Sequence, residues 1–240
     1  MSILEVSGLK KVYSTRFGGN KVEALKNVNF SVDQGEYVAI MGESGSGKTT
    51  LLNMIAALDK PTNGSVVLDG SDLAKIKESA VAVFSRDNLG FVFQEFNLLD
   101  TFTLEDNIYL PLVLAGKSYK EMHDRLMPIA SRLGISELLK KYPYEVSGGQ
   151  KQRAAVARAM ITDPKLILAD EPTGALDEQT GRQVLDYIDR LQKEIGFTMI
   201  LVTHNQNIAE MANTVIKMNS GRISEIAHHK TRKTAYEIGW

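Results

Sequence analysis

The hydrophobic positions near the start of the chain follow the two-residue period of β-strands. Within residues 3–7, Leu4 and Val6 point to one face and the other three residues point to the opposite face. Two more extended runs lie within residues 22–42, on either side of the turn residues 33–35. We therefore expect the first forty residues to form β-strands joined by tight turns.

Helical spacing of apolar residues becomes common after a glycine-rich loop at 42–47. The first helical run, LLNMIAALDK, is followed by Pro61 and by the turn pair Asn63-Gly64, which should end it. The periodicity predicts helices over 51–60, over 72–86 and over most of 104–160, and short strands at 65–70 and 89–94.

Two dense apolar runs in the second half of the chain are typical of central strands in a sheet that is covered on both faces. They are LILAD at 166–170 and MILVTH at 199–204. An amphipathic helix is predicted between them at 178–196, because its apolar residues recur at helical spacing. Strands that alternate with helices in this way predict an α/β fold.

The chain shows no internal repeat, linker or low-complexity segment, so we expect one folding unit of residues 1–240. The helical stretch at about 95–160 is expected to form a subdomain inserted in that unit. The tail after about residue 222 is rich in His, Lys and Arg and gives no interpretable pattern.

Composition excludes several classes of function. The chain is 43% hydrophobic and 24% charged, which suits an ordinary globular core. Lys and Arg number 28 against 29 Asp and Glu, which gives no reason to expect a nucleic-acid partner. The lack of cysteine excludes disulfides, thiolate metal sites and a cysteine nucleophile. No secretory signal and no apolar window of about 18 residues is visible, so we expect a soluble, cytoplasmic protein without a membrane span.

Residues 42–50, GESGSGKTT, match the phosphate-loop pattern G-x-x-x-x-G-K-[ST] between a predicted strand and a predicted helix. Glycines let backbone N–H groups turn toward a phosphate chain, and the following helix adds the positive end of its dipole. Lys48 would add a cation at the outer phosphates, and Thr49 a hydroxyl ligand for Mg²⁺. The candidate nucleotide-binding residues are Gly42, Glu43, Ser44, Gly45, Ser46, Gly47, Lys48, Thr49 and Thr50.

A pair of carboxylates follows the first dense apolar run. Asp170 ends that strand at the carboxyl edge of the sheet, where it could hold Mg²⁺, and Glu171 could orient or activate the attacking water. Taken alone, the pair could be a solvated acidic turn before Pro172. Together with the phosphate loop, it predicts a nucleotide hydrolase or kinase of the P-loop class.

A third motif, VSGGQKQR at 146–153, lies between the other two along the chain. A serine N-cap followed by two glycines leaves the start of a helix open to an anion. As an isolated string, the motif could be a helix cap only. In this order the three motifs resemble those of the ATP-binding-cassette (ABC) ATPases, and the resemblance covers roughly residues 3–222.

The resemblance implies a P-loop (RecA-like) core with an N-terminal antiparallel β subdomain and a helical subdomain that carries the signature. It implies hydrolysis of ATP with Mg²⁺, and a homodimer on ATP binding in which each signature closes on the nucleotide of the partner. The signature residues of this trans site are Ser147, Gly148, Gly149 and Gln150.

The resemblance also assigns single residues. Tyr13 matches an aromatic residue that stacks on adenine, although a strand tyrosine can equally belong to the core. Gln94 matches a glutamine that senses the metal and the water, and His204 a switch histidine at the terminal phosphate. Asp177, in the GALD segment, matches the loop that crosses the dimer interface.

The implied catalytic and metal sets overlap. The catalytic residues would be Glu171, His204 and Gln94, and the metal ligands Thr49, Gln94 and Asp170. Two positions depart from the family pattern: Asn205 replaces the familiar aspartate after the histidine, and Val146 replaces the commonest leucine before the signature. No role is assigned to position 205.

The segment at 92–112 looks like the branch of macrolide-export, lipoprotein-release and bacitracin or lantibiotic resistance ATPases, and 96–108 most resembles the peptide-resistance group. This branch implies a separate integral-membrane permease, which would dock near Gln94 and hold the chain at the cytoplasmic face of the membrane. The apolar residues after Gln94 could form that interface or pack the helical insertion onto the core; they are Phe96, Leu98, Leu99 and Phe102.

Other functions fit the same phosphate chemistry. The chain could be an ATP-gated module that signals to a membrane partner without transport, as in cell division. It could also power lipoprotein release or macrolide export. A small-molecule kinase is disfavoured, because the signature, the GALD segment and His204 would then have no role.

Overall fold

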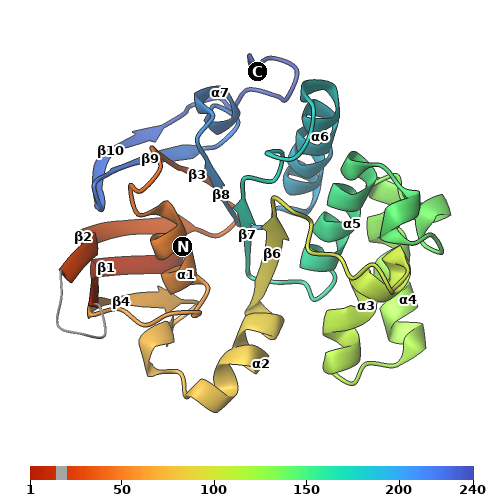
Figure 1. Cartoon of the computed structure of the whole chain (residues 1–240), viewed down its shortest axis with the longest axis horizontal. Coiled ribbons are helices and arrows are strands. Elements are labelled where there is room, and N and C mark those ends of the chain that lie inside the picture. Colours follow the sequence, from red (N-terminus) through yellow and green to blue (C-terminus); the bar gives the residue numbers. More distant parts are fainter. Residues whose placement is uncertain (15–20) are drawn as a thin grey trace.

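The computed structural model of the chain describes residues 1–14 and 21–240. One of its two sheets has four antiparallel strands in the order β2–β1–β4–β5 (Figure 1). The strands of this sheet are β1 (Ser2–Ser14), β2 (Lys21–Asp33), β4 (Asn63–Leu68) and β5 (Ser71–Asp72).

The second sheet has six strands in the order β10–β9–β3–β8–β7–β6, and all except β10 run parallel. Parallel strands end at the same edge of a sheet, so the loops that follow β3, β6, β7 and β8 emerge close to one another. The strands are β3 (Tyr37–Gly42), β6 (Leu89–Phe93), β7 (Leu166–Asp170), β8 (Met199–Thr203), β9 (Thr214–Asn219) and β10 (Arg222–His228).

The helices surround the six-stranded sheet. α5 packs against β6, α3, α4 and α6, so that α3, α4 and α5 form a helical group beside the sheet (Figure 1, green). The helices are α1 (Lys48–Ile55), α2 (Glu78–Asn88), α3 (Leu104–Leu114), α4 (Tyr119–Arg132), α5 (Gly148–Met160), α6 (Glu178–Ile195) and α7 (Gln206–Ala209). Single 3₁₀ turns lie at Leu73–Lys75, Ser136–Leu138 and Pro143–Glu145.

Alternate residues of the central strands serve two hydrophobic cores. In β3, Val38 and Ile40 belong to the core shared with α1 and the antiparallel sheet, whereas Ala39 and Met41 belong to the core under α5 and α6. β8 alternates in the same way. Both faces of this sheet are therefore covered, as the dense apolar runs predicted.

The predicted α/β fold is confirmed, and three predicted segments need correction. The helix predicted at 72–86 begins only at Glu78, because the Asp72 carboxylate accepts a hydrogen bond from the Ala74 N–H and starts a 3₁₀ turn instead. The helix predicted at 51–60 ends at Ile55, and Ala57 adopts a left-handed φ of 57°. No strands were predicted at 214–228, which form the β9–β10 hairpin. Part of the strand prediction for the first forty residues falls on 15–20, outside the described residues.

The tail after β10, which has no interpretable sequence pattern, packs back onto α6. Arg232 is almost fully buried, forms an ion pair with the buried Asp189 and donates to Gln192 Oε1 at 2.6 Å. Ala235 and Ile238 are buried in the core under α6. The tail is therefore part of the folded unit.

Replacing Asp189 by Ala should lower the free energy of unfolding by about 3 kcal/mol, because it leaves the Arg232 guanidinium buried without a carboxylate. The matched control is Asp124→Ala on α4, where the carboxylate pairs with Lys120 in solvent; this change should cost less than about 1 kcal/mol. Urea unfolding of both variants measures the difference, and equal losses would contradict a structural role for the tail.

Candidate functional site

The predicted phosphate loop connects β3 to α1 and is curled around a lysine. Lys48 Nζ donates to the carbonyl oxygens of Gly42 at 2.6 Å and Glu43 at 3.0 Å. Gly45 and Gly47 have φ angles of 77° and 104°, in the left-handed region that residues with a Cβ rarely enter. The sequence pattern needs glycine at these two positions because the backbone turns there.

Distant segments hold this loop in place. The Gly221 N–H, in the β9–β10 turn, donates to the Ser46 carbonyl at 2.9 Å, and the Lys26 N–H donates to the Gly221 carbonyl at 2.7 Å. A Cβ on Gly47 would lie 2.8 Å from the Ala24 carbonyl oxygen, so the loop rests closely on β2. The loop is thus supported by a strand and by a hairpin far apart in sequence.

A cavity of about 780 Å³ lies over the phosphate loop. Its walls come from the loop, from β2 and the β9–β10 turn, and from the ends of β7 and β8. Of the predicted site residues, those that line it are Ser44, Gly45, Gly47, Lys48, Thr49, Thr50, Asp170, Glu171 and His204. The parallel sheet therefore joins the phosphate loop, the carboxylate pair and the histidine in one site.

The two carboxylates differ in environment. Burial raises the pKa of Asp170, the neighbouring Glu171 raises it further, and Lys48 partly opposes both effects. Glu171 has a left-handed φ of 45°, which is costly for a residue with a side chain. Its Oε1 lies 2.8 Å from His204 Nδ1, and the histidine side chain is 70% exposed. A carboxylate held in this way can orient a water molecule beside a phosphate.

The residues at the cavity suit Mg²⁺ that binds together with a nucleotide. No group of three or more His, Asp or Glu side chains within 1–14 and 21–240 could hold a metal by itself. Thr49 and Asp170 both line the cavity and offer the oxygen ligands that Mg²⁺ prefers, with substrate phosphates and water completing its shell.

Gln94 does not line this cavity. It follows β6, and its side chain packs against Gly174, where an added Cβ would lie 2.9 Å from Gln94 Nε2. Gln94 thus contacts the segment that follows the carboxylate pair, and its predicted contact with metal stays a prediction.

The signature motif forms the start of α5. Ser147 Oγ accepts from the Gln150 N–H at 3.3 Å, and Gln150 Oε1 accepts from the Ser147 N–H at 2.9 Å, which makes a capping box. Gly149 packs closely against the start of α6, since a methyl group there would overlap Thr180, and Gly148 packs against Leu176 in the segment before α6. In Figure 1, α5 and α1 lie on opposite sides of β6 and β7. The structure therefore does not bring the signature to the cavity of its own chain.

The GALD segment forms a compact turn before α6. Asp177 is the N-cap of α6, where its carboxylate accepts from the Thr180 N–H at 3.0 Å. That backbone hydrogen bond lowers the pKa of Asp177. The Gly174 N–H donates to the Glu171 carbonyl at 2.9 Å, so this turn is tied directly to the strained glutamate.

Tyr13 stands near the end of β1 and pairs across the strands with Val22, which lines the cavity. Its hydroxyl donates to Asp59 at 2.9 Å, and Lys11 Nζ lies 4.9 Å from its ring centroid. Burial raises the pKa of Tyr13, and the Asp59 carboxylate adds to the effect. The ring is 41% exposed, so it remains available for the predicted stacking on adenine.

Two polar side chains of α5 that the sequence did not mark as functional join it to neighbouring segments: Gln152 is buried and Arg158 is half-buried. Gln152 donates to the Pro172 carbonyl at 2.6 Å and to the Phe93 carbonyl at 3.2 Å, and so joins α5 to the ends of β6 and β7. Arg158 donates to the Phe96 carbonyl at 2.8 Å and also to the Asn97 carbonyl. Burial lowers the pKa of Arg158. The sequence feature that could have identified both residues is a polar side chain on the face of a helix that packs against the core.

Asn205, to which no role was assigned, is the N-cap of α7. Its Oδ1 accepts from the Asn207 N–H at 2.9 Å. The amide oxygen of asparagine can cap a helix as well as the carboxylate oxygen of aspartate does.

A protein-family model described as "ABC transporter" matches residues 25–174. The chain is 44% identical to the bacitracin export ATP-binding protein BceA of Halalkalibacterium halodurans, over 99% of this chain and 94% of that protein. It is 41% identical to the macrolide export ATP-binding/permease protein MacB of Mannheimia succiniciproducens, over 93% of this chain and 34% of that protein.

Solved structures give the same result. The dimeric post-hydrolysis state of the ATP-binding cassette MJ0796, bound to ADP and Pi, has a TM-score of 0.84 and 36% identity, and covers 95% of this chain and 99% of that one. The chain belongs to the ABC transporter family. Within that family it is an ATP-binding cassette that hydrolyses ATP, which confirms the resemblance seen in the three motifs.

Within residues 1–14 and 21–240, no helix is both long enough and apolar enough to cross a bilayer.

Replacing Asp170 by Asn should stabilise the nucleotide-free protein at neutral pH. Folding raises the pKa of this carboxyl above its ordinary 3.8, so the folded chain binds the proton more tightly than the unfolded chain does. Stability of the wild type therefore falls as pH rises through the interval above 3.8, whereas the variant lacks this contribution. Melting temperatures of the two proteins should converge at acid pH and separate toward neutrality; a constant difference across the titration would contradict this.

Proposed function

We propose that the chain hydrolyses ATP with Mg²⁺ and thereby drives a separate integral-membrane permease that exports or removes amphipathic peptides. The observation that carries the proposal is the cavity in which Lys48, Thr49, Asp170, Glu171 and His204 meet. The near-full-length similarity to a bacitracin export ATP-binding protein supports peptides as the substrate class. The chain acts as one cassette, peripheral to the membrane at its cytoplasmic face, in which α3, α4 and α5 form the helical subdomain.

Each residue at the cavity has a distinct task in this proposal. Lys48 and the loop backbone hold the phosphates, and Tyr13 stacks on the adenine. Glu171 polarises the attacking water, and His204 holds the Glu171 carboxylate and contacts the outer phosphate. Thr49 and Asp170 hold Mg²⁺, with Gln94 joining them when its segment closes. A Mg²⁺ ion held by these residues would supply positive charge against the negative charge that develops during phosphoryl transfer.

The second half of each site comes from a second copy of the chain. The start of α5 presents a helix N-terminus that its own cavity does not use. In a head-to-tail homodimer, Ser147 and Gly149 reach the outer phosphate bound by the partner, while Asp177 lies at the interface. ATP bridges the copies and ADP lacks the bridging phosphate, so hydrolysis releases the dimer.

Glu171→Gln should retain ATP binding and lower turnover by about 100-fold or more, because the amide cannot accept a proton from water. The matched control is Glu194→Gln, an exposed carboxylate that pairs with Arg132 and should leave turnover unchanged. Steady-state phosphate release measures both. Turnover at the wild-type rate in Glu171→Gln would show that Glu171 does not polarise the attacking water.

The same variant tests the shared site. In the Glu171→Gln background, ATP should produce a dimer in size-exclusion chromatography, and adding Ser147→Arg should return the protein to a monomer that still binds ATP. Loss of ATP binding by the Ser147→Arg monomer would instead place the signature at the nucleotide of its own chain.

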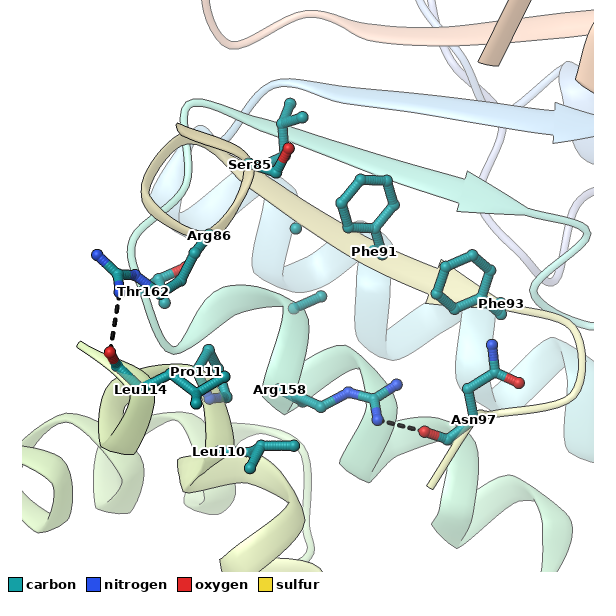
Figure 2. A pocket seen from close by; sticks show the side chains of 13 residues that line it. Ser85, Arg86, Phe91, Phe93, Asn97, Leu110, Pro111, Leu114, Arg158 and Thr162 are labelled. Atoms are coloured by element: carbon teal, nitrogen blue, oxygen red, sulfur yellow. Dashed lines mark hydrogen bonds between the residues drawn. The ribbon is translucent and has the colours of Figure 1, made fainter. Parts of the chain in front are cut away.

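A groove beside the Gln94 segment supports the permease as partner. It has a volume of about 360 Å³ and lies between β6 and α3, with α2 and α5 at its ends (Figure 2). Phe91 projects from β6 on one side, and Leu110 and Leu114 project from α3 on the other. Arg86 closes one end by donating to the Leu114 carbonyl at 2.9 Å. Apolar walls with a polar rim suit an inserted helix of a partner.

The groove is linked to the ATP site. Arg158, at its other end, donates to the Asn97 carbonyl (Figure 2) and to the Phe96 carbonyl. Phe96 and Asn97 both have left-handed φ angles and lie two and three residues after Gln94. Of the apolar residues expected to form an interface, Leu99 and Phe102 are exposed, whereas Leu98 packs against the core. Packing on the core is therefore confirmed for Leu98, whereas Leu99 and Phe102 remain available for the proposed interface.

Leu114→Arg should weaken permease docking by about 2 kcal/mol, roughly 30-fold in affinity, because Leu114 is 68% exposed at the groove and would be buried by a partner. Leu58→Arg, at a leucine of similar exposure outside the groove, should have no effect. The measurement is the amount of permease that co-purifies from native membranes in a gentle detergent, with ATP binding by the isolated chain as the folding check.

Peptide-stimulated ATPase of the purified complex in vesicles then tests the substrate class. Stimulation by an amphipathic antimicrobial peptide would support export or removal of peptides. Activity that responds only to a cell-wall partner would replace that assignment with ATP-gated signalling. If no membrane protein co-purifies with the chain under ATP-trapping conditions, the proposal of a permease partner would be contradicted.

A further inference from the structure

The tail that follows β10 ends beside the start of α6, where it places an aromatic ring against a glycine. A Cβ on Gly181 would overlap the Trp240 ring, so the indole lies directly on the helix backbone. The Arg182 guanidinium lies 5.7 Å from the centre of the ring. Trp240 is 38% exposed, so more than half of its surface is covered by the rest of the protein.

Hydrogen bonds fix the route of the tail to this point. Arg182 Nη1 donates to the carbonyls of Ala235 and Ile238, each at 2.8 Å. Both of these residues are buried in the core under α6. The side chain of Trp240 is therefore carried on an ordered segment that is bound to α6.

The ring lines a second, smaller cavity that reaches the catalytic residues. This cavity has a volume of about 190 Å³. Glu171 and His204 line it as well as the larger cavity over the phosphate loop. The other residues of its wall are Thr173, Gly174, Leu176, Thr203, Asn205, Ile208 and Trp240.

This cavity is bordered by Glu171, by the turn that begins at Gly174 and by His204, all of which must be placed accurately for catalysis. Glu171 is held at a strained φ of 45° and is tied to the turn at Gly174 by a backbone hydrogen bond. His204 is mostly exposed, and Glu171 Oε1 is the side-chain atom that contacts it. Trp240 lines the same cavity as the turn and the histidine, and it packs on Gly181, whose N–H donates to the Asp177 carbonyl of that turn at 2.8 Å. Small displacements of catalytic groups have large effects on rate.

We propose that Trp240 is a positioning residue for ATP hydrolysis: it braces the turn at 174–177 and the Glu171–His204 pair from the side away from the phosphate loop. This inference rests on the tasks proposed above for Glu171 and His204. It gives the tail after β10 a role in the rate of the reaction, in addition to its contribution to the fold.

Trp240→Ala should lower kcat by about tenfold or more and change the KM for ATP by less than about twofold, because Trp240 does not line the cavity over the phosphate loop. Trp240→Phe keeps an aromatic ring in the cavity and should restore most of kcat. Phosphate release gives both constants, with thermal unfolding and ATP binding as folding checks. A kcat of Trp240→Ala within twofold of the wild type would overturn the proposal.

A second variant tests the contact without removing the tryptophan. Gly181→Ala should displace the ring and lower kcat in the wild-type chain, yet in the Trp240→Ala background it should have no further effect, since alanine favours a helix. Effects that add in the double variant would overturn the proposal. If Trp240→Ala folds poorly, Gly181→Ala in the wild-type chain still tests the proposal, because it retains the tryptophan; an unchanged kcat in that single variant would overturn it.

Trp240 is the single tryptophan of the chain, so its fluorescence reports on this cavity. Addition of ATP and Mg²⁺ to Glu171→Gln should shift the emission, because closing of the turn against a partner changes the surroundings of the ring. An emission that ATP binding leaves unchanged would count against the brace. Failure of the proposed function is seen separately, as unimpaired turnover in Glu171→Gln, so the two results cannot be confused.

Discussion

Parallel pairing of β3, β7 and β8 is the constraint on which the rest of the molecule depends. Their registers place Ala39 beside Leu201 and Ala169 beside the same residue, so the three strands advance together to one edge. The phosphate loop, the carboxylate pair and the histidine each lie at the carboxyl end of a strand or directly after it. A slip of one strand by a residue would turn its side chains from one core to the other and would move its loop out of the site. Catalytic geometry and core packing are therefore specified by the same pairing.

Most of this architecture could be predicted from local patterns. The strands at 166–170 and 199–203 are dense in apolar residues because they are buried on both faces, and such runs are visible without any tertiary knowledge. The phosphate loop could also be predicted, because Gly45 and Gly47 adopt left-handed φ angles that favour glycine, and the motif has glycine at both positions. Helix boundaries were less predictable, because the extended start at 71–72 depends on pairing with β4.

What could not be predicted depends on contacts between distant segments. The hairpin at 214–228 joins the sheet at β3, and nothing in its own sequence identifies that partner. Gln152 looks like an ordinary polar residue of a helix until its two carbonyl partners are known. The composition of the tail beyond β10 is typical of an exposed, charged segment, although its Arg232 is buried against Asp189. Tertiary placement, and not composition, determines the role of each.

The support of the phosphate loop by the β9–β10 turn also affects how the chain matures on the ribosome. Ser46 accepts its hydrogen bond from Gly221, so two segments at opposite ends of the sequence must meet before the loop reaches its final form. Synthesis at about 5–20 residues per second delivers residue 221 roughly 9–35 seconds after residue 46. During that interval the phosphate loop has been made but lacks its hydrogen bond from Gly221. The supported form of the loop is therefore reached only after residue 221 has been made.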